Sequence, residues 1–148
     1  MHKGNEGFTL LEIMVVVIII GLLTTLVATT MVSRGEEAKV TIARSQIQKL
    51  SQALEMYRLD NGRYPSADQG LDALVREPSI EPLPKRYPAG GYVKRESISD
   101  PWGMTYQYRL PGSYNAHSYD LMSFGPDGLE GGEGSDADIG NWDVEPAR

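Results

Sequence analysis

The hydrophobic positions near the N-terminus form one uninterrupted apolar run. No charged residue occurs from Ile13 to Ser33. A run of roughly 20 residues at about 1.5 Å per residue matches the hydrocarbon thickness of a bilayer. A single span satisfies its own backbone hydrogen bonds in lipid only as a helix. The run therefore predicts a membrane-spanning helix, despite its many valine and isoleucine residues.

A removable secretory signal is the other interpretation of this run. Such a signal has a basic region, an apolar core of about 7–15 residues and small residues at its cleavage site. Here the basic region is only His2 and Lys3, the run is long, and residues 26–28 (Leu-Val-Ala) are a poor cleavage site. A mature chain that starts near Thr29 would support the signal, and one that starts at Phe8 would support a retained helix.

A second pattern follows Arg34, where apolar residues recur at steps of three and four, the spacing of one helical face. They are Val40, Ala43, Ile47, Leu50, Leu54 and Tyr57. Residues 60–62 (Asp-Asn-Gly) form a C-terminal cap signal, and Pro65 follows soon after. We expect one helix from Phe8 to about residue 60. The apolar seam is too short for a coiled coil, which needs about three heptads or more, so it is expected to pack on the chain's own sheet.

The rest of the chain predicts a short helix followed by a small sheet. Ser66 and Gln69 match a capping box ahead of residues 71–75. Residues 105–109 alternate between polar and aromatic positions, and 118–123 is the expected antiparallel partner strand. A short extended piece is expected at 92–93, and loops or turns at 77–88, 100–103 and 111–115. The predicted fold class is α+β, a long N-terminal helix packed against a small antiparallel sheet.

Composition narrows the possible functions. The chain has 148 residues, a net charge of −6 and no cysteine. This length fits one small domain on a membrane helix. The acidic balance and the lack of a basic patch argue against nucleic-acid binding. No nucleophile elbow, phosphate loop or zinc-protease motif occurs, and the two histidines, His2 and His117, lie far apart. The sequence therefore predicts a protein that is not an enzyme.

One carboxylate, Glu12, lies at the edge of the apolar run, just after a Gly7-Phe8 junction. An ionisable residue in that position is costly and needs a partner. The simplest interpretation is an acid at a helix N-terminus, which the helix dipole favours by under about 1 kcal/mol. The junction suggests another partner, an amino terminus created by cleavage. Two opposite charges brought together in a low dielectric remove much of each other's burial cost.

Residues 7–16 resemble the leader junction and helix start of type IV pilins and pseudopilins. In that family a prepilin peptidase cuts after the glycine and methylates the new N-terminus. The resemblance implies a leader that ends at Gly7 and an N-methylphenylalanine at Phe8. It also implies that Glu12 pairs with the N-terminal amine of a neighbouring subunit during assembly.

The head carries a second resemblance, to the major pseudopilins of type II secretion systems. Its motifs are at residues 57–65, 69–71, 100–103, 125–128 and 138–142. The absence of cysteine favours a pseudopilin, because many type IV pilins close their head with a disulfide. One departure from the family is Thr29, where a proline is common.

An acidic, glycine-rich loop spans residues 124–138. Hard oxygen ligands on a flexible loop suit Ca²⁺, whereas zinc prefers histidine or cysteine, and the loop has neither. A solvated acidic loop is the other interpretation. The resemblance implies one bound Ca²⁺ in this loop. Its implied ligands are Asp127, Asp136 and Asp138, with the backbone carbonyls of Phe124 and Leu129.

Four segments are expected: a prepilin leader (1–7), a transmembrane and filament-core helix (8–33), an amphipathic helical spine (34–62) and a periplasmic head (63–148). The resemblance implies a structural subunit that crosses the bacterial inner membrane once and keeps its C-terminal domain in the periplasm. It also implies that the subunit polymerises into a pseudopilus, which drives export of folded proteins across the outer membrane. The partners it implies are further copies of the chain, minor pseudopilins, the prepilin peptidase and an inner-membrane assembly platform. Two alternatives stay open, a type IV pilus subunit and a membrane-anchored, calcium-dependent binding domain that never polymerises.

Overall fold

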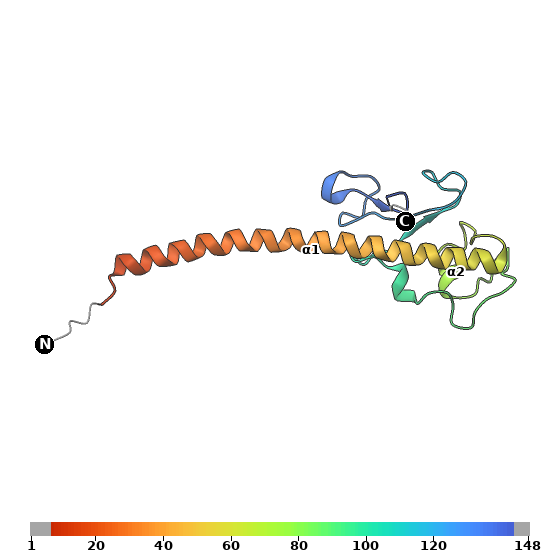
Figure 1. Cartoon of the computed structure of the whole chain (residues 1–148), viewed down its shortest axis with the longest axis horizontal. Helices are drawn as coiled ribbons and strands as arrows, with labels where there is room; N and C mark the ends of the chain where they lie inside the picture. Colours follow the sequence, from red (N-terminus) through yellow and green to blue (C-terminus); the bar gives the residue numbers. More distant parts are fainter. Residues whose placement is uncertain (1–6, 144–148) are drawn as a thin grey trace, which may run out of the picture. The chain divides into compact units, whose positions relative to one another are not determined.

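The computed structural model describes residues 7–143, without the side chains of residues 25–33. The chain divides into two units, residues 1–37 and 38–148. A single helix, α1 (Leu10–Asn61), has residues in both units (Figure 1). The expected leader, apart from Gly7, and the last five residues of the expected head lie outside the described residues.

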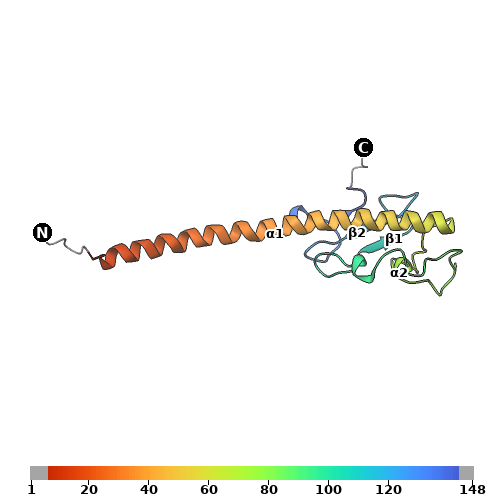
Figure 2. The ribbon, with the colours of Figure 1, turned by 60° about the horizontal axis from the view of Figure 1, so that its bottom comes forward.

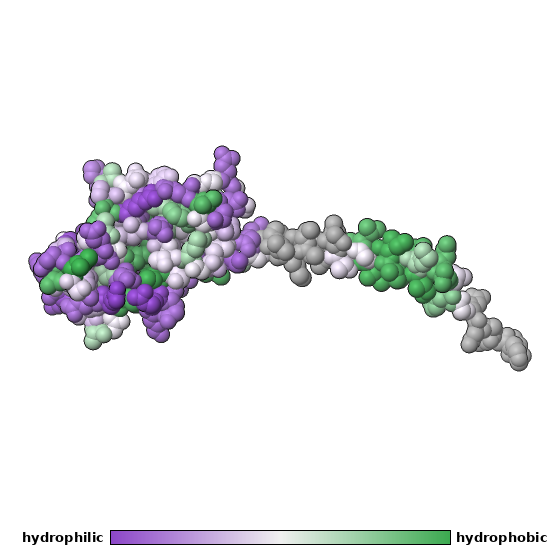
Figure 3. Space-filling view, turned by 180° about the vertical axis from the view of Figure 1, so that it is seen from behind, coloured by the Kyte–Doolittle hydropathy of each residue, from purple (hydrophilic) through white to green (hydrophobic). Residues whose placement is uncertain are grey.

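The first unit exposes a dense set of large apolar side chains on α1 and just before it (Figure 3). They include Phe8, Leu10, Leu11, Ile13, Met14, Val15, Val16, Val17, Ile18, Ile19, Ile20, Leu22 and Leu23. Within the residues whose side chains are described, no helical stretch is both long and apolar enough to qualify as a membrane span. The expected span of 8–33 also includes residues 25–33, whose side chains are outside the description.

In the second unit the apolar seam of α1 forms the centre of the core, as its spacing predicts. Ala43, Ile47, Leu50, Leu54 and Tyr57 are all buried. Figures 1 and 2 show α2 and the strands lying along this part of α1. The other members of the core are Ala53, Leu71, Ala73, Leu74, Ile98, Tyr106, Tyr119, Leu121 and Ile139, with Val40 packed against them. The seam therefore packs on the chain's own sheet and loops.

The C-terminal end of α1 lies where the cap signal places it. Gly62 adopts φ 77°, a left-handed conformation that suits glycine, and its N–H donates to the carbonyl of Arg58 at 2.7 Å. The buried Asn61 amide donates back to the carbonyl of Tyr57 at 3.0 Å. This cap satisfies carbonyls of the last turn that would otherwise lack donors.

The predicted capping box is present. Ser66 N–H donates to Gln69 Oε1 at 3.0 Å, and Gln69 N–H donates to Ser66 Oγ at 3.2 Å. The helix after it, α2 (Asp72–Val75), is shorter than expected. The extended piece expected at 92–93 is wrong, because both of these N–H groups donate to the single carbonyl of Leu74 in a bend. A 3₁₀ helix that the sequence did not predict, η1 (Arg95–Ile98), follows.

The sheet has three antiparallel strands in the order β1-β2-β3. The strands β1 (Gln107–Arg109) and β2 (Asp120–Ser123) lie within the two predicted strands, with Tyr108 opposite Leu121. The third strand, β3 (Ile139–Gly140), was not predicted, and it pairs Ile139 with Ser123. The β2–β3 connection contains a 3₁₀ turn, η2 (Gly134–Asp136).

Three polar side chains hold the backbone of the proline-rich segment 77–88. Arg63 donates to two carbonyls of this segment at 2.8 and 2.7 Å, and Gln69 donates to two at 2.9 Å each. Asn61 Oδ1 accepts the backbone N–H of Arg86 at 3.0 Å. An irregular segment without secondary structure thereby obtains hydrogen-bond partners for its backbone.

Candidate functional site

The start of α1 positions Glu12. Thr9 is the residue before the helix; its Oγ1 accepts the N–H of Glu12 and its carbonyl accepts the N–H of Ile13, both at 3.2 Å. Threonine is a favourable N-cap because its hydroxyl satisfies an otherwise free N–H. The Glu12 side chain is exposed, and it makes no hydrogen bond or ion pair with any described residue. The carboxylate is thus available to another molecule.

The acidic loop begins at a buried polar contact. Ser123, at the end of β2, donates its hydroxyl to Asp100 Oδ2 at 2.6 Å and accepts the N–H of Gly125 at 3.1 Å. Asp100 Oδ1 accepts two further N–H groups, from Trp102 at 3.0 Å and Met104 at 2.8 Å. The first residues of the loop are therefore tied to the predicted turn at 100–103.

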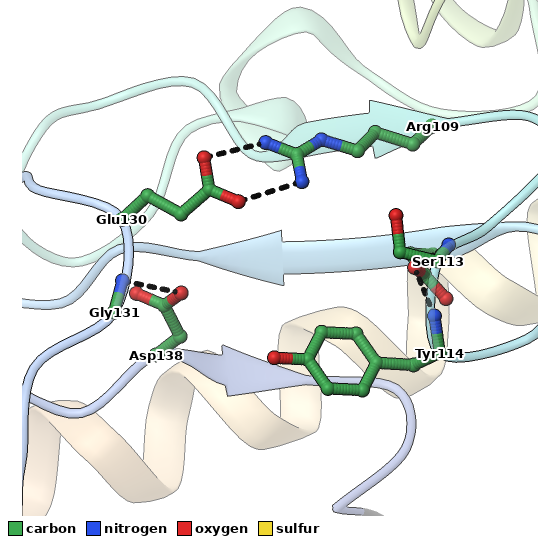
Figure 4. A network of polar contacts seen from close by, with 7 residues as sticks. Arg109, Ser113, Tyr114, Glu130, Gly131 and Asp138 are labelled. Carbon is green, nitrogen blue, oxygen red and sulfur yellow. Dashed lines mark hydrogen bonds and ion pairs between the residues drawn. The ribbon is translucent and has the colours of Figure 1, made fainter.

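The loop ends at Asp138, which pairs reciprocally with Gly131 (Figure 4). Gly131 N–H donates to Asp138 Oδ2 at 2.9 Å, and Asp138 N–H donates to the Gly131 carbonyl at 3.1 Å. The other carboxylate oxygen, Asp138 Oδ1, is buried and has no hydrogen-bond partner. An unpaired buried carboxylate oxygen is costly, so this atom needs a hydrogen-bond donor or a cation.

The remaining expected ligands are less converged. Asp127 Oδ1 accepts the N–H of Leu129 at 3.1 Å in a local turn, and Asp136 is exposed. Within residues 7–143 as described, no three acidic, histidine or cysteine side chains gather as a ready metal cluster. Phe124 directly precedes the turn at residues 125–128, and Leu129 directly follows it. The oxygen-only donor set and the orphan oxygen of Asp138 fit a Ca²⁺ ion.

An ion pair that the sequence did not predict joins the loop to β1 (Figure 4). Arg109 donates from Nη1 to Glu130 Oε1 at 2.7 Å and from Nη2 to Glu130 Oε2 at 2.8 Å. The hydrogen bonds from Arg109 hold the pKa of Glu130 below its usual value. The two residues are 21 positions apart, so no local spacing links them in the sequence.

The buried carboxylate of Asp120 was also missed. It accepts the backbone N–H groups of Ser113 at 2.5 Å, Tyr114 at 2.9 Å and Asn115 at 2.9 Å, and the Asn115 side-chain amide at 3.0 Å. Burial alone would raise the pKa of Asp120, but these donors outweigh burial and hold the pKa below its usual value. Asp120 thus fixes the turn between β1 and β2.

Two family descriptions match the chain. "Type II secretion system (T2SS), protein G" matches residues 30–142, and "Prokaryotic N-terminal methylation motif" matches residues 2–28. The first covers most of the chain, including the helical seam, the sheet and the acidic loop.

Curated relatives and a solved structure agree with these matches. The chain is 53% identical over 142 residues to type II secretion system core protein G of Pseudomonas aeruginosa, covering 96% of this chain and 98% of the relative. It is 49% identical to the corresponding Vibrio cholerae protein, covering 97% of this chain and 95% of that relative. A crystal structure of the major pseudopilin from the type 2 secretion system of enterohaemorrhagic Escherichia coli superposes with a TM-score of 0.67 at 41% identity, covering 78% of this chain and 92% of that one. The head of the chain is thus similar to a pseudopilin head.

Proposed function

Because the chain belongs to the protein G family of type II secretion, the major pseudopilins, we propose that it is cut after Gly7 and polymerises through Glu12. The family is one of structural subunits and not of enzymes. The matching head favours this function over the type IV pilus subunit and over the anchored binding domain.

The observation that carries the assembly proposal is the position of Glu12. Its carboxylate lies in the first turn of α1 among exposed apolar side chains and has no partner among the described residues. When these apolar side chains pack against other copies in lipid or in a filament, the carboxylate loses water and needs a cation. The methylated amine of Phe8 on a neighbouring copy supplies that charge. Contacts that repeat head to tail without closing produce a fibre.

The mature subunit in this proposal crosses the inner membrane once and keeps its head in the periplasm. There it joins further copies and minor pseudopilins on an inner-membrane platform. The N-terminal methylation motif supports the peptidase as a processing partner. The resulting pseudopilus drives folded proteins across the outer membrane.

The maturation step is tested by the mass of the purified full chain. We expect the mature protein to lack residues 1–7 and to carry one methyl group on Phe8, because the peptidase of this proposal both cuts and methylates. Gly7→Ile blocks a small-residue cleavage site and is expected to leave the unprocessed mass, whereas Gly90→Ala, in an exposed loop of the head, serves as the control and is expected to be processed. A mature chain that starts near Thr29 would contradict the proposal.

We also propose that the acidic loop binds one Ca²⁺. Asp138 Oδ1 is the anchoring ligand in this proposal, because it is buried and unpaired. Asp127 and Asp136 supply further carboxylate oxygens, and the carbonyls of Phe124 and Leu129 complete the set. When bound, the ion supplies positive charge between the arms of the loop, and its binding energy adds to the stability of the folded head.

Removal of Ca²⁺ is expected to lower the melting temperature of the head by roughly 10 °C. An ion present at about 100 times its dissociation constant contributes about 2.7 kcal/mol, and 1 kcal/mol shifts the midpoint of a domain of this size by several degrees. The measurement is a thermal melt with CaCl₂ or with chelator. Asp138→Asn should melt at the chelated temperature under both conditions. Glu133→Gln, an exposed acid of the same loop outside the proposed ligand set, should keep the difference. A wild-type midpoint that chelator does not change would refute the calcium site.

A further inference from the structure

The acidic loop crosses the whole sheet. It leaves the central strand β2 at Ser123, meets the edge strand β1 through Glu130, and returns to the other edge at Ile139 of β3. Glu130 is the residue that ties the middle of this connection to a strand, by its contact with Arg109. The loop therefore contacts all three strands. It joins β2 to β3, and Glu130 adds the contact with β1.

The Arg109–Glu130 pair has the geometry of a strong ion pair. Both carboxylate oxygens receive a separate guanidinium N–H, at 2.7 and 2.8 Å. Exposed ion pairs are usually worth little, and bidentate pairs of arginine with carboxylate are the exception. Each oxygen of Glu130 already accepts a guanidinium N–H, so a metal would have to compete with Arg109 for this acid. The pair separates Glu130 from the other acids of the loop.

The Arg109–Glu130 pair lies next to Gly131, which is the hydrogen-bond partner of the candidate metal ligand Asp138. Gly131, next to Glu130, makes the two reciprocal hydrogen bonds with Asp138. These bonds occupy Asp138 Oδ2 and leave Oδ1 as the buried, unpaired oxygen. Figure 4 shows the Arg109–Glu130 ion pair and the Gly131–Asp138 hydrogen bond, which involve consecutive residues of the loop. Holding Glu130 on β1 thus holds Gly131, and through Gly131 it holds the orientation of the Asp138 carboxylate.

We propose that Arg109 is a positioning residue for the acidic loop: it ties Glu130 to β1, excludes Glu130 from the ligand set, and keeps Asp138 oriented in the metal-free protein. The effect of Arg109 on metal affinity depends on the calcium site proposed above. Its effect on the order of the loop in the metal-free protein is independent of that site. Pre-organisation of this kind raises affinity because less freedom is lost on binding.

The test compares the full chain in detergent micelles with the double variant Arg109→Met with Glu130→Gln. This variant removes one charge of each sign and so keeps the net charge. In the metal-free protein, hydrogen exchange at the Gly131 and Asp138 amides is expected to become about fivefold faster, as for the loss of about 1 kcal/mol from a local opening equilibrium. With Ca²⁺ as the ligand, the dissociation constant is expected to rise about fivefold as well. The reversed pair, Arg109→Glu with Glu130→Arg, is expected to restore part of the exchange protection and part of the Ca²⁺ affinity.

The matched control is Arg76→Gln with Asp72→Asn, which removes the exposed ion pairs of Asp72 with Arg76 at 3.2 Å and with Arg95 at 3.4 Å, far along the sequence from the loop. This control is expected to leave both the exchange rates at Gly131 and Asp138 and the dissociation constant for Ca²⁺ unchanged. Unchanged exchange at Gly131 and Asp138 in the Arg109 double variant would overturn the inference. If the wild-type chain takes up no Ca²⁺, the calcium proposal fails on its own, and the exchange rates still decide whether Arg109 orders the loop.

Discussion

Cells that express Glu12→Ala are expected to form no pseudopilus filaments and to secrete at least about tenfold less protein. The variant removes the only charge that we assign to the incoming amine of Phe8. That amine would then lie unpaired among apolar side chains, at a cost of several kcal/mol, and each 1.4 kcal/mol corresponds to about a factor of ten. The head does not contain Glu12, so its folding is expected to be unchanged.

The measurement is electron microscopy of filaments sheared from cells, together with the amount of secreted protein. Glu96→Ala makes the same chemical change at an exposed acid of the head, where η1 lies, and is expected to assemble normally. Processing by the peptidase is followed by mass in both variants, so that a cleavage defect is separated from an assembly defect. Normal filaments in Glu12→Ala would show that a different contact recruits the subunit.

Asp120→Ala is expected to lower the free energy of unfolding of the head by about 3 kcal/mol. Asp120 is fully buried and accepts four hydrogen bonds, three of them from backbone N–H groups of the turn that it fixes. The variant leaves these donors without a partner, and a buried unsatisfied group costs about 1–3 kcal/mol. Urea unfolding at pH 7 measures the loss. Asp68→Ala, at an exposed position, is the control and is expected to stay within about 0.5 kcal/mol of wild type.

Acid should reduce the difference in the free energy of unfolding between wild type and Asp120→Ala. The pKa of Asp120 is lower in the folded chain than its usual value. Its contribution is therefore complete above the unfolded pKa of about 3.9 and is lost as pH falls through the lower folded pKa. The expected result is a gap in unfolding free energy that is constant from pH 7 to about pH 5 and narrows below about pH 4. A gap that widens in acid would show that Asp120 does not stabilise the fold as a carboxylate.

The parts of this fold that the sequence predicted are those that local spacing determines. The recurrence of apolar residues by three and four identified the buried face of α1, and a glycine with φ 77° ends that helix where the cap signal lies. The reciprocal bonds of Ser66 and Gln69 form as the capping box predicts. Each of these features depends on residues within about one helical turn of each other, so the chain shows them without its tertiary structure.

The parts that the sequence missed depend on pairs distant along the chain. Arg109 and Glu130 meet across 21 positions, and only the folded sheet brings them together. The strand β3 has two residues, too few for an alternating pattern. Asp120 lies within a predicted strand, where an acid is usually exposed, and its burial follows from the turn that folds over it. For the acidic loop, composition indicated oxygen ligands, but it did not distinguish Asp138, with its unpaired oxygen, from Glu130, which an arginine already holds.

The bonds that hold the proline-rich segment 77–88 have a mechanical consequence. Asn61 ends α1, and Arg63 and Gln69 follow it within a few residues. Their five hydrogen bonds anchor the segment to the end of the helix at four backbone atoms, because the carbonyl of Pro82 accepts two of them. A push or pull on this segment is thus transmitted directly to the C-terminal end of α1.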